Sequence, residues 1–112
     1  MASIDINKVA SDMLNAAKGV LTTQWTIVEP FAKLQFKQLA QNLELIVSLK
    51  ITGKITEEQS QLLFSMHKHA QTILLISLEG ISIVTAEKAI NAALDVVKNT
   101  VNTAIGFPLI LI

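Results

Sequence analysis

Apolar residues recur along this chain at steps of three and four, the spacing that lines one face of an α-helix. The first such run covers about residues 5–23, where the polar residues fall mostly on the opposite side. Its main apolar positions are Ile6, Val9, Met13, Ala16 and Val20. Because Asn-Gly and Asp-Gly hairpin signals are missing, the pattern predicts an all-α protein.

Two further helices are predicted in the middle of the chain, at about residues 30–52 and 56–80. Pro30 suits the first position of a helix, and Gly53 suits a left-handed exit. Thr56 and Gln59 have the spacing of a capping box. The connection at 52–55 is so short that the two helices should be antiparallel neighbours.

The second predicted helix carries two apolar stripes rather than one. The main stripe includes Phe36, Leu39 and Leu43, and a second, offset stripe consists of Leu34, Leu45 and Leu49. A helix with two apolar sides is expected to contact neighbours on both of them.

The stretch from Thr56 to Ala104 leaves two arrangements open. Its polar stripe shifts by about 120° between the two halves at 100° per residue, so a straight helix cannot keep one buried face. Gly80, with Thr85 as a new cap, favours a break and a fourth helix at about 85–105. The prediction is an up-and-down four-helix bundle. The alternative is three helices with a long, kinked C-terminal one, since glycine costs a helix only about 1 kcal/mol.

The composition is strongly apolar, with 51% hydrophobic and 16% charged residues, against roughly 25% charged in typical soluble domains. Residues 1–112 are expected to form one helical domain with an apolar C-terminal tail at 106–112, because no linker-like stretch divides them. A domain this short buries only about two-thirds of its unfolded surface. Part of the apolar excess should therefore meet another subunit, a partner or lipid.

The leading hypothesis is a non-enzymatic, self-associating helical module with a structural or protein-interaction role. Its partner is expected to be another copy of the chain, in a symmetric homo-oligomer. The tail and the small-residue face of the last helix are the expected contact surfaces. The candidate interaction residues are Val97, Val101, Phe107, Leu109, Ile110, Leu111 and Ile112.

A membrane-associated or pore-forming protein is the alternative hypothesis. Residues 70–86 carry one charge, Glu79, and lie at the short limit for a span. An acidic side chain near the middle costs roughly 2.5–3.5 kcal/mol on insertion, which disfavours spanning. Without a signal-like N-terminus, a cytoplasmic location is the default. Glu79 is also the one possible functional charge. If its carboxylate is buried, it needs a lysine or hydrogen-bond donors as partners. If it lies on the polar stripe, it is simply exposed to solvent.

Catalytic, cofactor-binding and metal residues are not assigned. The chain has no cysteine for disulfides or thiolate chemistry, and it shows no glycine-rich phosphate loop. His67 and His69 lie two residues apart, so a helix points them about 200° from each other. Scattered lysines and the absence of arginine argue against a nucleic-acid partner. A third hypothesis, a binder with a cavity in the bundle, would need a buried polar cluster around Glu79 or His67.

Overall fold

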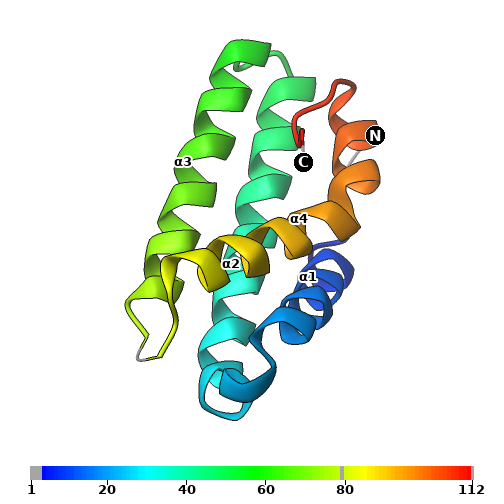
Figure 1. Cartoon of the computed structure of the whole chain (residues 1–112). Coiled ribbons are helices and arrows are strands. Elements are labelled where there is room, and N and C mark those ends of the chain that lie inside the picture. The colour runs from blue at the N-terminus through cyan, green and yellow to red at the C-terminus, as the bar shows by residue number, and fades with distance from the viewer. Residues whose placement is uncertain (1–3, 79, 112) are drawn as a thin grey trace.

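The computed structural model describes residues 4–78 and 80–111, and this part of the chain contains helices and no strand. The α-helices are α1 (Ile6–Leu21), α2 (Trp25–Ile51), α3 (Glu57–Ile76) and α4 (Ile83–Ile105), and a 3₁₀ turn (Thr22–Gln24) joins the first two (Figure 1). The all-α prediction is confirmed.

The first half of the chain forms one bent run of helix over residues 6–51, because α1, the 3₁₀ turn and α2 follow one another directly. The part of the chain that the structure describes thus has three helices when this run is counted once. That count fits the three-helix alternative, although the long element comes first in the chain rather than last.

The predicted turn before Pro30 is corrected. The bend lies at Thr22–Gln24, and Pro30 sits inside α2. Proline removes the hydrogen bond to the carbonyl group four residues earlier, which belongs to Thr26. Because Thr26 is exposed, water can satisfy that carbonyl, and the helix continues through the proline.

The predicted break between the last two helices is present, since α3 ends at Ile76 and α4 begins at Ile83. Gly80 has a φ of +86°, a left-handed conformation that favours glycine. The predicted cap at Thr85 is corrected: Ser82 is the N-cap, and its hydroxyl oxygen accepts a 3.1 Å hydrogen bond from the Thr85 amide.

The predicted capping box at the start of α3 is confirmed. The Gln59 amide donates to the Thr56 hydroxyl at 3.0 Å, and the Thr56 amide donates to the Gln59 side-chain oxygen at 2.8 Å. After the short turn, α3 runs antiparallel beside α2 (Figure 1). The Gln35 side chain of α2 donates to the Gln71 carbonyl of α3 at 2.6 Å, which shows which sides of the two helices face each other.

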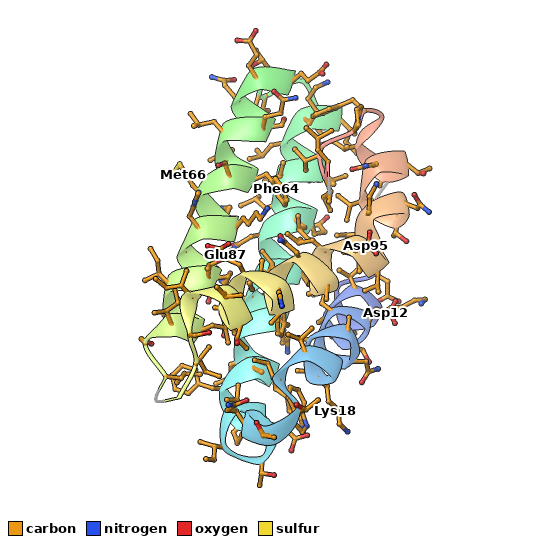
Figure 2. The ribbon with its side chains drawn as sticks, viewed as in Figure 1. Asp12, Lys18, Phe64, Met66, Glu87 and Asp95 are labelled. Carbon is orange, nitrogen blue, oxygen red and sulfur yellow. The ribbon has the colours of Figure 1, made fainter. Side chains whose placement is uncertain are left out.

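The core lies where α1, α2 and α4 meet. Met13, Phe36 and Ile90, one from each of these helices, are fully buried. In contrast, the buried large apolar side chains of α3 are only Phe64 and Leu75. Figure 2 shows Phe64 pointing from α3 toward α2, whereas Met66 points away from the other helices. The helix α3 is therefore the least embedded of the four.

The apolar tail folds back onto the end of α4. Gly106 ends the helix with a φ of +90°. The side chain of Asn102 then holds Ile110 by both backbone groups: its Nδ2 donates to the Ile110 carbonyl at 3.0 Å, and its Oδ1 accepts from the Ile110 amide at 2.9 Å. Leu109 is 2% exposed and Ile110 is 0% exposed, so the tail closes the core.

Candidate functional site

The interaction residues predicted from the sequence do not form one exposed surface. Four of them are buried within the chain, namely Val97, Val101, Leu109 and Ile110, so their expected position on a contact surface is corrected. The physical reason is that α4 packs its small-residue face along α1, while Asn102 fixes the tail. Phe107 is half-buried, with the Lys50 Nζ 5.9 Å from its ring centroid, and Leu111 is exposed. Ile112 and Glu79 lie outside the described residues.

Exposed apolar side chains gather instead on one side of the α2–α3 pair. The side chain of Gln35 marks the side of α2 that faces α3. Counted around α2 at 100° per residue from Gln35, the buried Phe36, Leu43 and Val47 lie on the side toward α1 and α4. The exposed apolar residues of α2 lie at similar angles in the opposite direction. We call the resulting surface the outer face. Its apolar residues are Ile27, Phe31, Leu34 and Leu45 of α2 with Ala70 and Leu74 of α3.

Several side chains of the outer face are largely open to solvent. Ile27 is 79% exposed, Leu34 is 74% exposed and Phe31 is 52% exposed. The apolar surface continues around the far side of α3 through Met66 and Ile73. Contiguous exposed apolar surface of this kind marks interaction sites on small proteins.

The outer face carries no lysine, aspartate or glutamate among the described residues. The charged residues Glu29, Lys33 and Glu44 of α2 fall on other sides of the helix at 100° per residue. The polar groups on the outer face include the amides of Gln38 and Gln41 and the half-buried imidazole of His67. The surface is thus mainly apolar and carries no lysine or carboxylate side chain among its described residues.

A groove lies on the opposite side of α3. The helix α4 starts beside the end of α3 and then runs obliquely across α2, so it moves away from α3 and leaves space beside it (Figure 1). Two adjoining cavities occupy this space, with volumes of about 400 Å³ and 430 Å³. They share Ser65 and Lys68 as lining residues.

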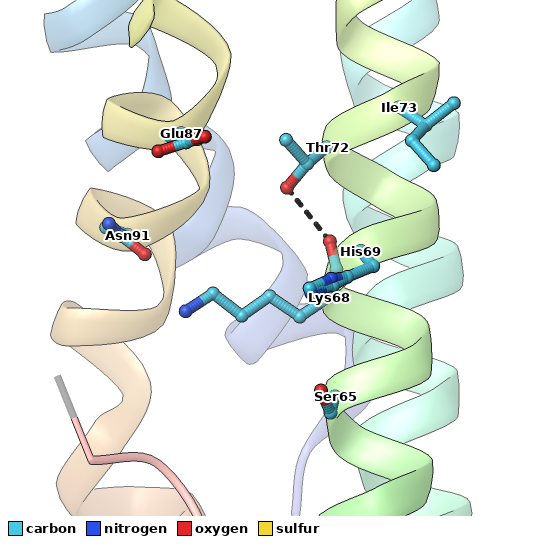
Figure 3. Close-up of a pocket in the computed structure, with 7 residues that line it drawn as sticks. All are labelled: Ser65, Lys68, His69, Thr72, Ile73, Glu87 and Asn91. Carbon is cyan, nitrogen blue, oxygen red and sulfur yellow. Dashed lines mark hydrogen bonds between the residues drawn. The ribbon is translucent and has the colours of Figure 1, made fainter. Parts of the chain in front are cut away.

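The first cavity is the polar part of the groove. It lies between α3 and α4, and Lys68 extends from α3 toward α4 while Glu87 and Asn91 project from the facing helix (Figure 3). No ion pair joins Lys68 to Glu87 in the described part of the chain. The Asn91 Oδ1 atom is buried and has no hydrogen-bond partner among residues 4–78 and 80–111.

The second cavity is the apolar part of the groove. The tail residues Leu109 and Leu111 line it together with Phe64 and Gln61 of α3. Leu111 is 76% exposed, whereas Phe64 and Leu109 are buried. The polar and apolar parts meet at Lys68, which gives the groove an amphipathic character.

The two histidines lie in different places. His69 lines the first cavity, and His67 belongs to the outer face. No group of three or more His, Cys, Asp or Glu side chains converges within residues 4–78 and 80–111 to hold a metal ion. No helix in the same part of the chain is long and apolar enough to cross a membrane.

Sequence reasoning missed both surfaces. The offset stripe of Leu34 and Leu45 was a signal for the outer face, because it predicts a second apolar side of α2. The groove has no comparable local signal in the sequence, because Lys68 and Asn91 line the same cavity only as a result of the direction in which α4 runs past α3. No family model, curated protein or solved structure matches this chain.

Proposed function

We propose that this chain is a non-enzymatic, self-associating helical module with a structural or protein-interaction role, and that the outer face binds a second copy. The observation that carries this proposal is the uncharged apolar surface of the α2–α3 pair. Ile27, Phe31 and Leu34 form its most exposed cluster along α2. A second copy of the same face supplies an apolar partner for each of them.

The size of the outer face supports a stable dimer. At a rise of about 1.5 Å per residue, the segment 27–45 of α2 is about 27 Å long. Two helices packed about 10 Å apart present a width of about 20 Å, which gives a flat area of about 540 Å². This flat area is about two-thirds of the roughly 800 Å² per partner in stable interfaces, and side chains that project from the two helices add accessible area to it.

The charge pattern also suits a second copy. A two-fold symmetric interface places the same patch against itself, so charges near the axis would oppose like charges. The middle of the outer face avoids this repulsion because Lys33 and Glu44 lie on other sides of α2 and Lys37 lies at the edge of the face, about 40° beyond Gln41 at 100° per residue. Gln38 and Gln41, which both donate and accept hydrogen bonds, can pair with their own copies.

The proposal is tested by a charge introduced into the outer face. The wild-type chain should sediment at about twice its 12.2 kDa mass, and Leu34→Glu should weaken the dimer at least about a hundredfold, since each dimer would bury two unpaired carboxylates. Val84→Glu is the matched control: Val84 is 62% exposed on α4, outside the outer face, and its substitution should leave the dimer intact. Sedimentation equilibrium over a range of concentrations measures both.

Two results would contradict the proposal. One is a wild-type chain that stays monomeric at every concentration. The other is a monomer that floats with phosphatidylcholine vesicles and loses this binding on Leu34→Glu. The second result would replace the dimer with the membrane-associated alternative, in which lipid covers the outer face.

A further inference from the structure

We propose that the groove between α3, α4 and the tail binds a small amphipathic carboxylate, such as a medium-chain fatty acid. Its carboxylate lies at Ser65 and Lys68, and its hydrocarbon chain lies over Phe64, Leu109 and Leu111. This site is on the opposite side of α3 from the outer face, so it does not depend on self-association.

The donors for the carboxylate lie where the two cavities meet. Ser65 and Lys68 are three residues apart on α3, which places them next to each other on the helix surface. Both line both cavities. Within the described residues, the Lys68 ammonium group has no ion pair and the Ser65 hydroxyl has no hydrogen bond. An ammonium group and a hydroxyl together can donate to the two oxygens of one carboxylate.

The apolar part of the ligand is set by the second cavity. Phe64 and Leu109 form buried apolar walls, and Leu111 adds a side chain that is 76% exposed. A hydrocarbon chain that covers Leu111 removes apolar surface from water on both partners. The cavity volume of about 430 Å³ falls within the roughly 300–1,000 Å³ of small-molecule sites.

The polar part of the groove suits the hydration of a headgroup. Glu87 and Asn91 line the first cavity together with Ser65 and Lys68, and its volume of about 400 Å³ has room for water molecules. Water molecules in this cavity can donate hydrogen bonds to the bound carboxylate. Glu87 lines only the first cavity, whereas Lys68 lines both. The charged residue next to the apolar walls of the second cavity is therefore Lys68.

The experiment is a titration of the full chain with octanoate, followed by amide chemical shifts in two-dimensional NMR. Saturable shifts are expected around Ser65, Asn91 and Leu111. Lys68→Met keeps the length of the side chain but removes the charge, and it should weaken octanoate binding at least about tenfold. Lys37→Met removes an exposed lysine of α2 far from the groove and should leave the affinity unchanged.

Two further probes separate the headgroup from the chain. Octan-1-ol, which lacks the charge, should bind the wild-type chain about as weakly as octanoate binds Lys68→Met. Acetate, which lacks the chain, should bind much more weakly than octanoate. Leu111→Ser should also weaken octanoate binding, and since Leu111 is exposed, this variant keeps the core intact.

The proposal is overturned by any of three results. These are the absence of saturable octanoate binding, an unchanged affinity in Lys68→Met with an unchanged unfolding transition, and equal affinities for acetate and octanoate. Leu34→Glu adds an independent check, because loss of octanoate binding in that variant would show that octanoate binds at the outer face and not in the groove.

Discussion

The C-terminal tail and the outer face of α2 and α3 are both rich in large aliphatic side chains, yet they differ in exposure. In the tail, Leu109 and Ile110 are almost completely buried. On the outer face, Ile27 and Leu34 are 79% and 74% exposed. A continuous apolar run in the sequence is therefore a poor guide to where the exposed apolar surface of this protein lies.

Backbone hydrogen bonding explains the difference. An irregular segment can be buried only when its amide and carbonyl groups find partners, and Asn102 supplies both partners for Ile110. The backbone of the outer face is already satisfied within two helices. Nothing in the described chain ties a further element to that face, so its side chains remain open to solvent and to a second copy.

Removal of the tail is the strongest way to test this comparison. Deletion of residues 107–112 exposes core that Leu109 and Ile110 now cover, at about 1.5–3 kcal/mol for each buried side chain. The free energy of unfolding should therefore fall by about 3–6 kcal/mol in urea titrations. If the deletion instead abolished the dimer at unchanged stability, the tail rather than the outer face would be the contact surface.

Local signals predicted much of the fold. The capping box of Thr56 and Gln59 needs only four neighbouring residues, and it predicted the start of α3 correctly. Gly80 likewise marked the connection before α4. The position of Pro30 was predicted wrongly because its preference for the first helical turn is statistical. Since Thr26, four residues earlier, is an exposed residue, α2 tolerates the proline deeper in the helix.

Nonlocal contacts account for what the sequence did not predict. Burial of the tail depends on Asn102, whose partner Ile110 lies eight residues further along the chain. The groove depends on the oblique path of α4, which brings Asn91 toward Lys68 of α3. Neither relation has a periodicity that a pattern of apolar and polar residues could reveal.

A pair of single substitutions tests the contrast within the tail itself. Ile110→Ala creates a cavity at a fully buried position and should lower the free energy of unfolding by about 2–5 kcal/mol. Leu111→Ala removes a neighbouring side chain that is 76% exposed and should change it by less than about 0.5 kcal/mol. Equal effects in urea titrations would show that the tail is not docked as described.

The hydrogen bonds of Asn102 provide the most specific test of why the tail is buried. Asn102→Ala leaves the amide and carbonyl groups of the buried Ile110 without these partners, and it should lower the free energy of unfolding by about 1–3 kcal/mol. Asn99→Ala is the matched control, because Asn99 is exposed on the same helix and should be nearly neutral. Amide hydrogen exchange at Ile110 supplies a second measurement, since it should accelerate in Asn102→Ala before the core helices open. Unchanged protection would mean that apolar contacts alone hold the tail, and the explanation by backbone hydrogen bonding would then fail.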